Sequence, residues 1–190
     1  MAKYKLYNSE KVHDLREMIE KSSIRYPNKT AFLQKVDGKY KPVSYIRFKN
    51  DIDSFGTALT QRGFAGKRVI VLGENCYSWC LAYMTVTCGL GAVVPVDKEI
   101  PAEEVANIAK ISEAALIIYS KKYEAKVAQL PESIEKIAFD EMVSYIIDGA
   151  ELLSAGNKDY LELSIDRDAL CSLIFTSGTT GVSKGVMLSQ

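Results

Sequence analysis

The chain has 190 residues, of which 47% are hydrophobic and 25% charged, and its 24 basic and 24 acidic side chains give a formal net charge of zero. This is the composition of an ordinary globular protein, long enough for a sizeable core in one domain or two. Because nucleic-acid-binding proteins usually carry a basic excess, the charge balance argues against a nucleic-acid partner while leaving room for a small anionic ligand.

The cysteines and the single histidine give no sign of a metal site. Cys76, Cys80, Cys88 and Cys171 never fall in Cys-x-x-Cys spacing, and His13 is the one histidine that could join them. We therefore expect no bound metal held by these residues. The apolar neighbours of Cys88 and Cys171 predict buried, reduced thiols, whereas Cys76 and Cys80 have the spacing to meet on one helix face, where packing is the expected role.

Targeting and membrane signals are not found in the sequence. The first residues hold no apolar stretch suited to a signal peptide. Nowhere do about twenty apolar residues run together, as a membrane-spanning helix requires. We therefore expect a cytoplasmic protein without a transmembrane segment.

The first predicted element is a helix. An apolar stripe near helical spacing begins at Val12 and ends at Ile24. Ser9 is the expected cap, and Asp14 is expected on the solvent side. His13 is placed in this helix as a surface residue.

A hairpin and a second helix are predicted next. Residues 30–36 and 39–43 have the composition of strands and flank Asp37-Gly38, a dipeptide that favours a hairpin turn. Aromatic and aliphatic residues then recur at three- and four-residue steps, which predicts a helix capped by Ser44 and ended by Gly63.

From residue 69 onward, apolar strands alternate with helices. Strands are expected at residues 69–72, 92–97, 115–119, 137–139 and 173–175, and helices at residues 77–87, 101–111, 122–130 and 141–147. Pro95 lacks an N–H donor, which predicts a place at a sheet edge or a strand end. Asp140 is a candidate helix cap, and residues 149–168 are expected to be partly irregular. The alternation predicts an α/β fold with a mainly parallel sheet and helices on both faces.

The last stretch carries the strongest functional signal. The apolar run 173–175 leads into Thr176-Ser-Gly-Thr-Thr-Gly181, followed by Lys184-Gly185 and a second apolar run at 186–188. Hydroxyls donate and accept hydrogen bonds, glycines let N–H groups turn toward a ligand, and the lysine adds positive charge. This set favours a phosphate-binding loop over the alternative, a solvated turn between two strands. It is not a Walker A motif, which requires Gly-Lys-Ser/Thr.

The fold and the motif agree on the place of this loop. In parallel sheets with helices on both faces, ligands bind beyond the carboxyl ends of the strands. The loop follows Phe175, the last residue of a predicted strand.

The run from Phe175 to Gly185 resembles the phosphate loop of the adenylate-forming superfamily, which contains acyl-CoA synthetases, adenylation domains of peptide synthetases and luciferases. Ser183 and Gln190 depart from the family pattern, which usually has proline and often histidine there. Residues 44–59 and 86–97 are also similar to family signatures, in family order, so the resemblance extends over essentially the whole chain. Residues 73–75 and 95–101 look most like long-chain fatty acyl-CoA synthetases.

The resemblance implies a fold and a site. Residues 1–190 would be the N-terminal subdomain of an AMP-binding domain, part of the large N-terminal domain of acyl-CoA synthetase-like enzymes. The remainder of that domain, with the acyl pocket, and a C-terminal lid domain with the catalytic lysine would lie beyond it. No catalytic residue is expected in the fragment itself. The implied ATP phosphate-binding residues are Thr176, Ser177, Gly178, Thr179, Thr180, Gly181 and Lys184.

The resemblance also implies a reaction, in which ATP, Mg²⁺ and coenzyme A are the co-substrates of the complete enzyme. A carboxylic acid, here a fatty acid, becomes an acyl-adenylate and then a thioester. The fragment alone is expected to be inactive and to self-associate through apolar surface that truncation exposes. Two alternatives stay open: a non-catalytic α/β nucleotide- or phosphate-binding module, and an adenylation enzyme whose acceptor is a carrier-protein thiol.

Overall fold

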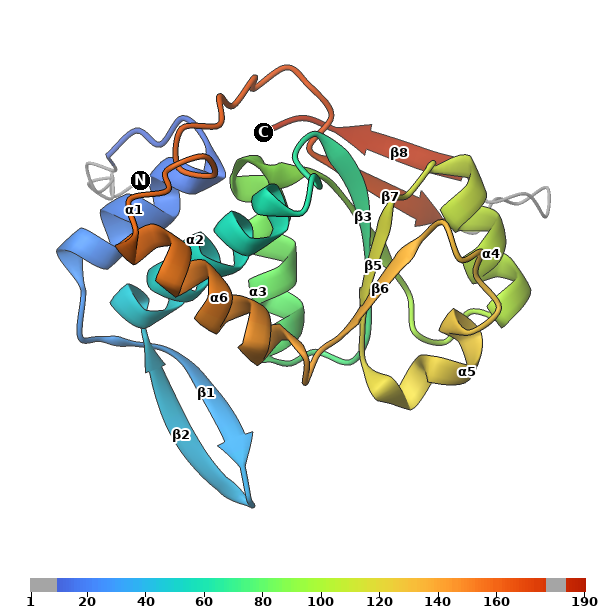
Figure 1. Cartoon of the computed structure of the whole chain (residues 1–190), viewed down its shortest axis with the longest axis horizontal. Coiled ribbons are helices and arrows are strands. Elements are labelled where there is room, and N and C mark those ends of the chain that lie inside the picture. The colour runs from blue at the N-terminus through green and yellow to red at the C-terminus, as the bar shows by residue number, and fades with distance from the viewer. Residues whose placement is uncertain (1–9, 177–183) are drawn as a thin grey trace, which may run out of the picture.

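A hairpin and a six-stranded sheet organise residues 10–176 and 184–190, the part of the chain that this computed structural model describes (Figure 1). The hairpin consists of β1 (Thr30–Val36) and β2 (Lys39–Ser44). The large sheet has the order β6-β5-β3-β4-β7-β8. Its strands are β3 (Lys67–Leu72), β4 (Gly91–Val96), β5 (Leu116–Tyr119), β6 (Glu135–Ala138), β7 (Ser172–Thr176) and β8 (Lys184–Leu188).

Six α-helices, a π-helical turn and a 3₁₀ turn connect these strands in the described ranges. The α-helices are α1 (Leu15–Arg25), α2 (Tyr45–Gln61), α3 (Tyr77–Thr85), α4 (Ala102–Ile111), α5 (Glu124–Val127) and α6 (Met142–Ser154). The π-helical turn, Val86–Leu90, follows α3 directly, and the 3₁₀ turn, Lys121–Tyr123, precedes α5.

The large sheet is parallel except at its last pair. Val69 of β3 lies opposite Val93 of β4 on one side and Leu116 of β5 on the other, and both pairings are parallel. β7 pairs in parallel with β4 at Ser172, whereas β8 runs antiparallel to β7. The prediction of a mainly parallel α/β fold is confirmed.

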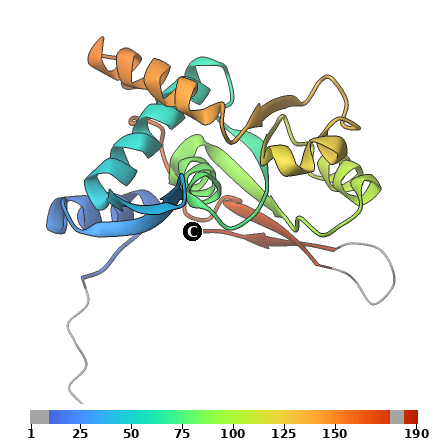
Figure 2. The same cartoon turned by 90° about the horizontal axis from the view of Figure 1, so that it is seen from below.

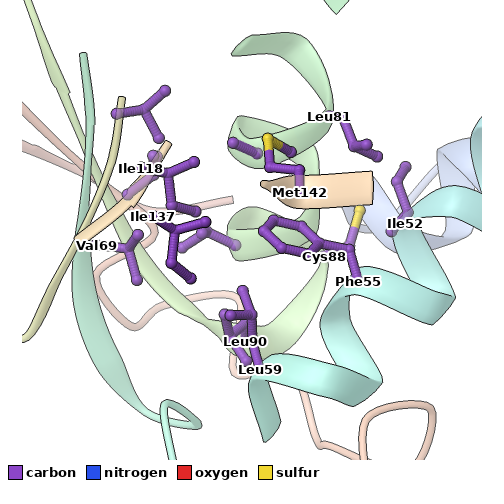
Figure 3. Close-up of a cluster of buried hydrophobic side chains, with 14 of the residues drawn as sticks. Ile52, Phe55, Leu59, Val69, Leu81, Cys88, Leu90, Ile118, Ile137 and Met142 are labelled. Atoms are coloured by element: carbon purple, nitrogen blue, oxygen red, sulfur yellow. The ribbon is translucent and has the colours of Figure 1, made fainter. Parts of the chain in front are cut away.

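The two faces of the sheet pack against different helices. Val69 and Val71 belong to a core cluster shared with α1, α2, α3 and α6, which Figure 3 shows. Ile70 and Leu72 belong to a second cluster, shared with α4 and α5 on the opposite face (Figure 1). Because strand residues alternate between faces, a strand buried on both sides needs the uninterrupted apolar run that the sequence shows.

The first helix differs from its prediction at its start. α1 begins at Leu15, and its N-cap is Asp14, whose Oδ1 accepts a hydrogen bond from the Glu17 N–H at 2.8 Å. Asp14 is therefore a capping residue, His13 precedes the helix, and the predicted cap Ser9 lies outside the described residues. Val12, which is 47% exposed, precedes the helix and adds nothing to the core.

The hairpin and the second helix follow their predictions. Asp37 and Gly38 have φ angles of 51° and 77°, the pair of positive values that a tight hairpin turn uses. Ser44 caps α2 by accepting a hydrogen bond from the Arg47 N–H at 3.3 Å. Gly63, with φ of 82°, follows the end of the helix.

The prediction for Pro95, a sheet edge or a strand end, is confirmed as a strand end. β4 is an inner strand between β3 and β7, and Pro95 is its next-to-last residue. β4 pairs with β7 earlier, at Val93. The missing N–H therefore falls where this pairing has ended, which is how an inner strand accommodates a proline.

The sixth helix is longer than predicted. α6 continues to Ser154 and includes Gly149, which we expected in the irregular segment. A Cβ atom at position 149 would overlap the carbonyl oxygen of Ser54 in α2, so the glycine permits the close packing of the two helices. Asp140 does not cap α6. It pairs with Lys121 at 2.7 Å, and Glu141 is the N-cap residue. Residues 155–171 contain no helix or strand, as expected.

The cysteines are all free, and Cys88 and Cys171 are buried as predicted. Among the described residues, no group of three or more His, Cys, Asp or Glu side chains is arranged to hold a metal ion. None of the helices in the same ranges has the length and apolar character needed to cross a membrane.

Candidate functional site

The predicted phosphate-binding loop connects two strands that pair with each other. Thr176 is the last residue of β7 and Lys184 the first residue of β8, and these two residues are partners in the antiparallel ladder. The ladder continues through Phe175 and Gly185 to Ser172 and Leu188. The structure therefore places two of the seven predicted site residues side by side. The other five, Ser177, Gly178, Thr179, Thr180 and Gly181, lie outside the described residues.

The position of this hairpin in the sheet fits a ligand site. β7 runs parallel to β4, and through β3 and β5 to β6, so its carboxyl end lies at the sheet edge where those strands also end. Ligands of open parallel sheets bind beyond this edge. Thr176 and Lys184 thus lie at the edge that the sequence predicted. Figure 2 shows the β7–β8 pair extending from the body of the molecule.

The charge of Lys184 is not matched by an ion pair in the described part of the chain, and the residue is exposed. A lysine without an ion pair opposite a threonine in the ladder is compatible with an anion site, because the lysine supplies charge and the hydroxyl supplies a donor. The hairpin geometry is compatible both with a phosphate-binding loop and with a solvated turn.

Other polar groups at this edge neutralise each other. A hollow of about 500 Å³ beyond β3, β5 and β6 is lined by residues that include Glu74, Lys121, Lys122 and Asp140. Lys122 pairs with Glu74 at 2.8 Å, and Lys121 with Asp140 at 2.7 Å. Burial alone would raise the pKa of Glu74, but the hydrogen bond from Lys122, the hydrogen bonds from the Glu74 backbone and from Ser120, and the charge of Lys122 together outweigh burial and lower the pKa. Because each lysine has its carboxylate, this hollow offers less attraction to an anion than Lys184 does.

One structural residue, at the end of β8 opposite to Lys184, was not predicted from the sequence. Gln190 lies two residues beyond β8, and its side chain bonds to the start of α1 and to the π-helical turn. The sequence showed Gln190 as a departure from a family pattern. A single glutamine gives no periodicity or spacing from which these distant contacts could be inferred.

The structure defines an α/β unit with a mainly parallel sheet, and comparison with known proteins gives its family. Residues 19–190 match the AMP-binding enzyme family. The chain belongs to this family of adenylate-forming enzymes.

Curated relatives are carrier-protein ligases and peptide synthetases. The chain is 30% identical over 184 residues to the L-proline--[L-prolyl-carrier protein] ligase of Pseudomonas fluorescens, covering 93% of this chain and 34% of the relative. It is 28% identical over 148 residues to the D-alanine--D-alanyl carrier protein ligase of Streptococcus pneumoniae, covering 77% of this chain and 27% of the relative. The chain thus spans about a third or less of these relatives.

Solved structures confirm the fold. The N-terminal domain of FACL13 from Mycobacterium tuberculosis superposes with a TM-score of 0.77 at 21% identity, covering 94% of this chain and 44% of that chain. A fatty acyl CoA synthetase of the same organism superposes with a TM-score of 0.76 at 20% identity, covering 93% and 34%. The expected membership in acyl-CoA synthetase-like N-terminal domains is confirmed at the level of fold.

Proposed function

We propose that residues 1–190 supply the ATP phosphate-binding part of an enzyme that activates a fatty acid as an acyl-adenylate and passes the acyl group to coenzyme A. Membership in the adenylate-forming family supports activation of an acid. The observation that carries the site is the pairing of Thr176 with Lys184 at the carboxyl edge of the sheet.

The chain's own residues serve the first step by binding and positioning phosphate. A carboxylate oxygen attacks the α-phosphorus of ATP, the bond to the bridging oxygen breaks, and pyrophosphate leaves. Negative charge on the phosphates opposes this attack, so a lysine near them lowers the barrier by charge stabilisation and orientation. Lys184 supplies that charge, and the Thr176 hydroxyl binds a phosphate oxygen. Mg²⁺, when bound with ATP, supplies further charge neutralisation.

The second step is thioester formation. A thiolate attacks the acyl carbonyl carbon, and AMP leaves with the electron pair of the bond that breaks. AMP is a far better leaving group than the oxygen of a free carboxylate, which is why adenylation precedes transfer. This scheme assigns binding and charge stabilisation to Thr176 and Lys184, and neither residue acts in it as a nucleophile or base.

A carrier-protein thiol is the second candidate acceptor. It is favoured by the names of curated relatives, among which are carrier-protein ligases at 28% and 30% identity. Coenzyme A is favoured by the likeness of residues 73–75 and 95–101 to fatty acyl-CoA synthetases, and by a fatty acyl CoA synthetase among the structural neighbours. A non-catalytic nucleotide-binding module is the remaining alternative.

Acid-dependent exchange of labelled pyrophosphate into ATP tests the proposal. The assay uses the longest product of the gene, acids of graded chain length, D-alanine and L-proline, with the 190-residue chain as comparison. Exchange with fatty acids supports the proposal, and exchange with an amino acid alone moves the assignment to carrier-protein ligases. A folded product that exchanges with no acid supports a binding module. The 190-residue chain should show no exchange.

The Lys184→Ala variant tests the site. We expect it to weaken ATP binding at least tenfold, because the variant removes a charge from a phosphate site. The matched control is Lys158→Ala, which removes an exposed lysine from the irregular segment after α6. Equal ATP affinities in Lys184→Ala and Lys158→Ala would contradict the assigned role.

Self-association of the 190-residue chain is a related proposal. β8 is an edge strand whose residues are all exposed, and Val186, Met187 and Leu188 are 45%, 69% and 42% exposed. An exposed apolar edge strand offers unpaired backbone groups to a second copy. Light scattering should show concentration-dependent association that Met187→Lys reduces, and a clean monomer at high concentration would refute it.

A further inference from the structure

The side-chain amide of Gln190 is bonded at both of its ends. Its Oε1 accepts a hydrogen bond from the Leu15 N–H at 2.8 Å, and its Nε2 donates to the Thr87 carbonyl oxygen at 2.6 Å. Its main-chain N–H donates to the Arg167 carbonyl oxygen at 3.2 Å. These two partners fix the orientation of the amide, because the Leu15 N–H can only donate a hydrogen bond and the Thr87 carbonyl oxygen can only accept one.

Each side-chain partner is a backbone group that its own element leaves unpaired. Leu15 is the first residue of α1, and the first N–H groups of a helix have no acceptor within it. Thr87 lies in the π-helical turn, whose regular backbone is interrupted at Gly89 (φ of 121°) before the turn ends at Leu90. The next carbonyl oxygen of that turn, Cys88, accepts from Arg16 Nε at 2.8 Å. Gln190 and Arg16 thus satisfy consecutive carbonyl groups of one turn.

These bonds hold the end of β8 to the helices. β8 is an edge strand, so it is held on one side only, by its ladder with β7. At the end of that ladder, the Cys171 N–H donates to the Leu188 carbonyl oxygen at 2.8 Å. Two residues later, Gln190 ties the chain to α1 and to the π-helical turn. Lys184 is at the other end of the same strand.

We propose that Gln190 is a positioning residue for the nucleotide site: by fixing the end of β8 to α1 and to the π-helical turn, it holds Lys184 in place relative to the body of the sheet. The effect of Gln190 on ATP binding rests on the proposed function, whereas its effect on the stability of β8 does not. ATP affinity and hydrogen exchange of β8 are therefore measured separately.

The position requires a neutral side chain with one acceptor and one donor at opposite ends. A neutral imidazole offers one of each, whereas a protonated imidazole has donors only and would face the Leu15 N–H with another N–H. A carboxylate cannot donate to Thr87, and leucine does neither. The Gln190→His variant therefore converts a pH-independent anchor into one that fails as pH falls through the histidine range.

Charged groups around position 190 do not protect a protonated imidazole. They come from the segment at the start of α1, from the segment before β7 and from β3, and they are Asp14, Arg16, Asp166, Arg167 and Arg68. The α-carboxylate of residue 190, the last residue of the 190-residue chain, adds a third anion, so three cations face three anions. This balance gives no net charge that would move the protonation of a histidine at position 190 out of its usual range.

The experiment follows backbone hydrogen exchange of β8 by mass spectrometry in the 190-residue chain. Gln190→His is compared with the wild type at pH values from about 8 to about 5.5, which span the usual histidine range. We expect wild-type protection near pH 8 and roughly tenfold faster exchange of β8 below pH 6, relative to wild type at the same pH, as the anchor bonds are lost. Gln190→Leu and Gln190→Glu should exchange faster at all pH values.

Controls separate this effect from general destabilisation. Gln129→His adds a histidine at an exposed glutamine and should leave β8 protection unchanged. The pH change is made within one folded variant, so a failure of Gln190→Leu to fold does not remove the test. Protection of β8 that is the same in wild type and Gln190→His at every pH would overturn the proposal.

Calorimetric titration with ATP provides the second measurement. If Gln190 positions Lys184, ATP affinity of Gln190→His should fall in parallel with β8 protection. A chain that shows the exchange effect but binds no ATP even as wild type would keep the anchor of β8 and contradict the proposed nucleotide function. ATP affinity that stays constant while β8 loosens would overturn the positioning role.

Discussion

Arg16 makes two contacts with Tyr160, a hydrogen bond to its backbone and a cation–π contact with its ring. Arg16 Nη2 donates to the Tyr160 carbonyl oxygen at 3.1 Å, and the guanidinium carbon lies 5.5 Å from the centroid of the Tyr160 ring. The other guanidinium N–H groups donate to the carbonyl oxygens of Cys88, Leu161 and Leu163. One cation thus connects α1, the π-helical turn and the irregular segment after α6.

The first prediction concerns the stability contributed by Arg16. Arg16→Met keeps much of the side-chain volume but leaves four carbonyl groups without their donor. We expect a loss of about 2–4 kcal/mol in the free energy of unfolding, since hydrogen bonds to a charged group contribute more than neutral ones and partial solvent access offsets some of the loss. Urea unfolding measures this loss in the free energy of unfolding.

The control is Arg25→Met, at an exposed position on the same helix, which should change stability by less than about 0.5 kcal/mol. Equal losses in the two variants would refute the assignment.

The second prediction concerns the contact between α2 and α6. Gly149→Ala should gain about 1 kcal/mol from helix propensity if nothing else changed. The added methyl group would, however, overlap the Ser54 carbonyl oxygen, a backbone atom that cannot rotate away. Overpacking of this kind costs typically about 1–3 kcal/mol and more against backbone, so we expect a net loss of about 2 kcal/mol.

Thermal unfolding of Gly149→Ala measures this loss. Ser154→Ala, at an exposed position on the same helix, is the control and should stay within about 0.5 kcal/mol of wild type. A Gly149→Ala variant more stable than wild type would mean that α2 and α6 do not approach as closely as described.

The contact between α2 and α6 illustrates which parts of the fold could be predicted from the sequence and which could not. The buried strands could be predicted because an apolar run such as Val69–Leu72 is uncommon outside a sheet covered on both faces. Gly149 could not be interpreted correctly, because a glycine that ends a helix and a glycine that admits a neighbouring helix look the same in the sequence. Only the position of Ser54 distinguishes them.

For the candidate site, too, local features could be predicted from the sequence, whereas contacts between distant residues could not. The hydroxyl and glycine content after Phe175 predicted a phosphate-binding loop, and the strand before it predicted the sheet edge, because both follow from local chemistry. The contacts of Arg16 and Gln190 join residues far apart in the sequence. Their donors meet backbone carbonyls that any residue type could supply, so no pattern of side chains marks them in advance.

The third prediction concerns the reactivity of the thiols. Burial raises the pKa of Cys88 to about 12, and also raises the pKa of Cys171. Because the thiolate is the reactive form, neither should be alkylated in the native protein at about pH 8. Cys76 and Cys80 are partly exposed, although burial raises the pKa of each, so slow alkylation is expected there.

Iodoacetamide labelling followed by peptide mass spectrometry tests this order. All four cysteines should react in concentrated urea, which controls for intrinsic reactivity. Native labelling of Cys88 at the rate of Cys80 would show that the π-helical turn opens far more often than its buried contacts allow.

The fourth prediction concerns acid stability through Glu17. A hydrogen bond from Lys21 and others from His13 lower the pKa of Glu17 to about 2, from a usual value of 4.5. A carboxylate whose pKa is lower in the folded state stabilises the fold above its unfolded pKa, and this stabilisation is lost as pH falls through the folded value.

The Glu17→Gln variant has no carboxylate that titrates at this position. The difference in unfolding free energy between wild type and Glu17→Gln should therefore be constant near pH 5 and shrink between pH 4.5 and about 2. Urea unfolding across this range measures it. Glu20→Gln, an exposed carboxylate on the same helix, is the control, and an equal trend in both variants would contradict the role of Glu17.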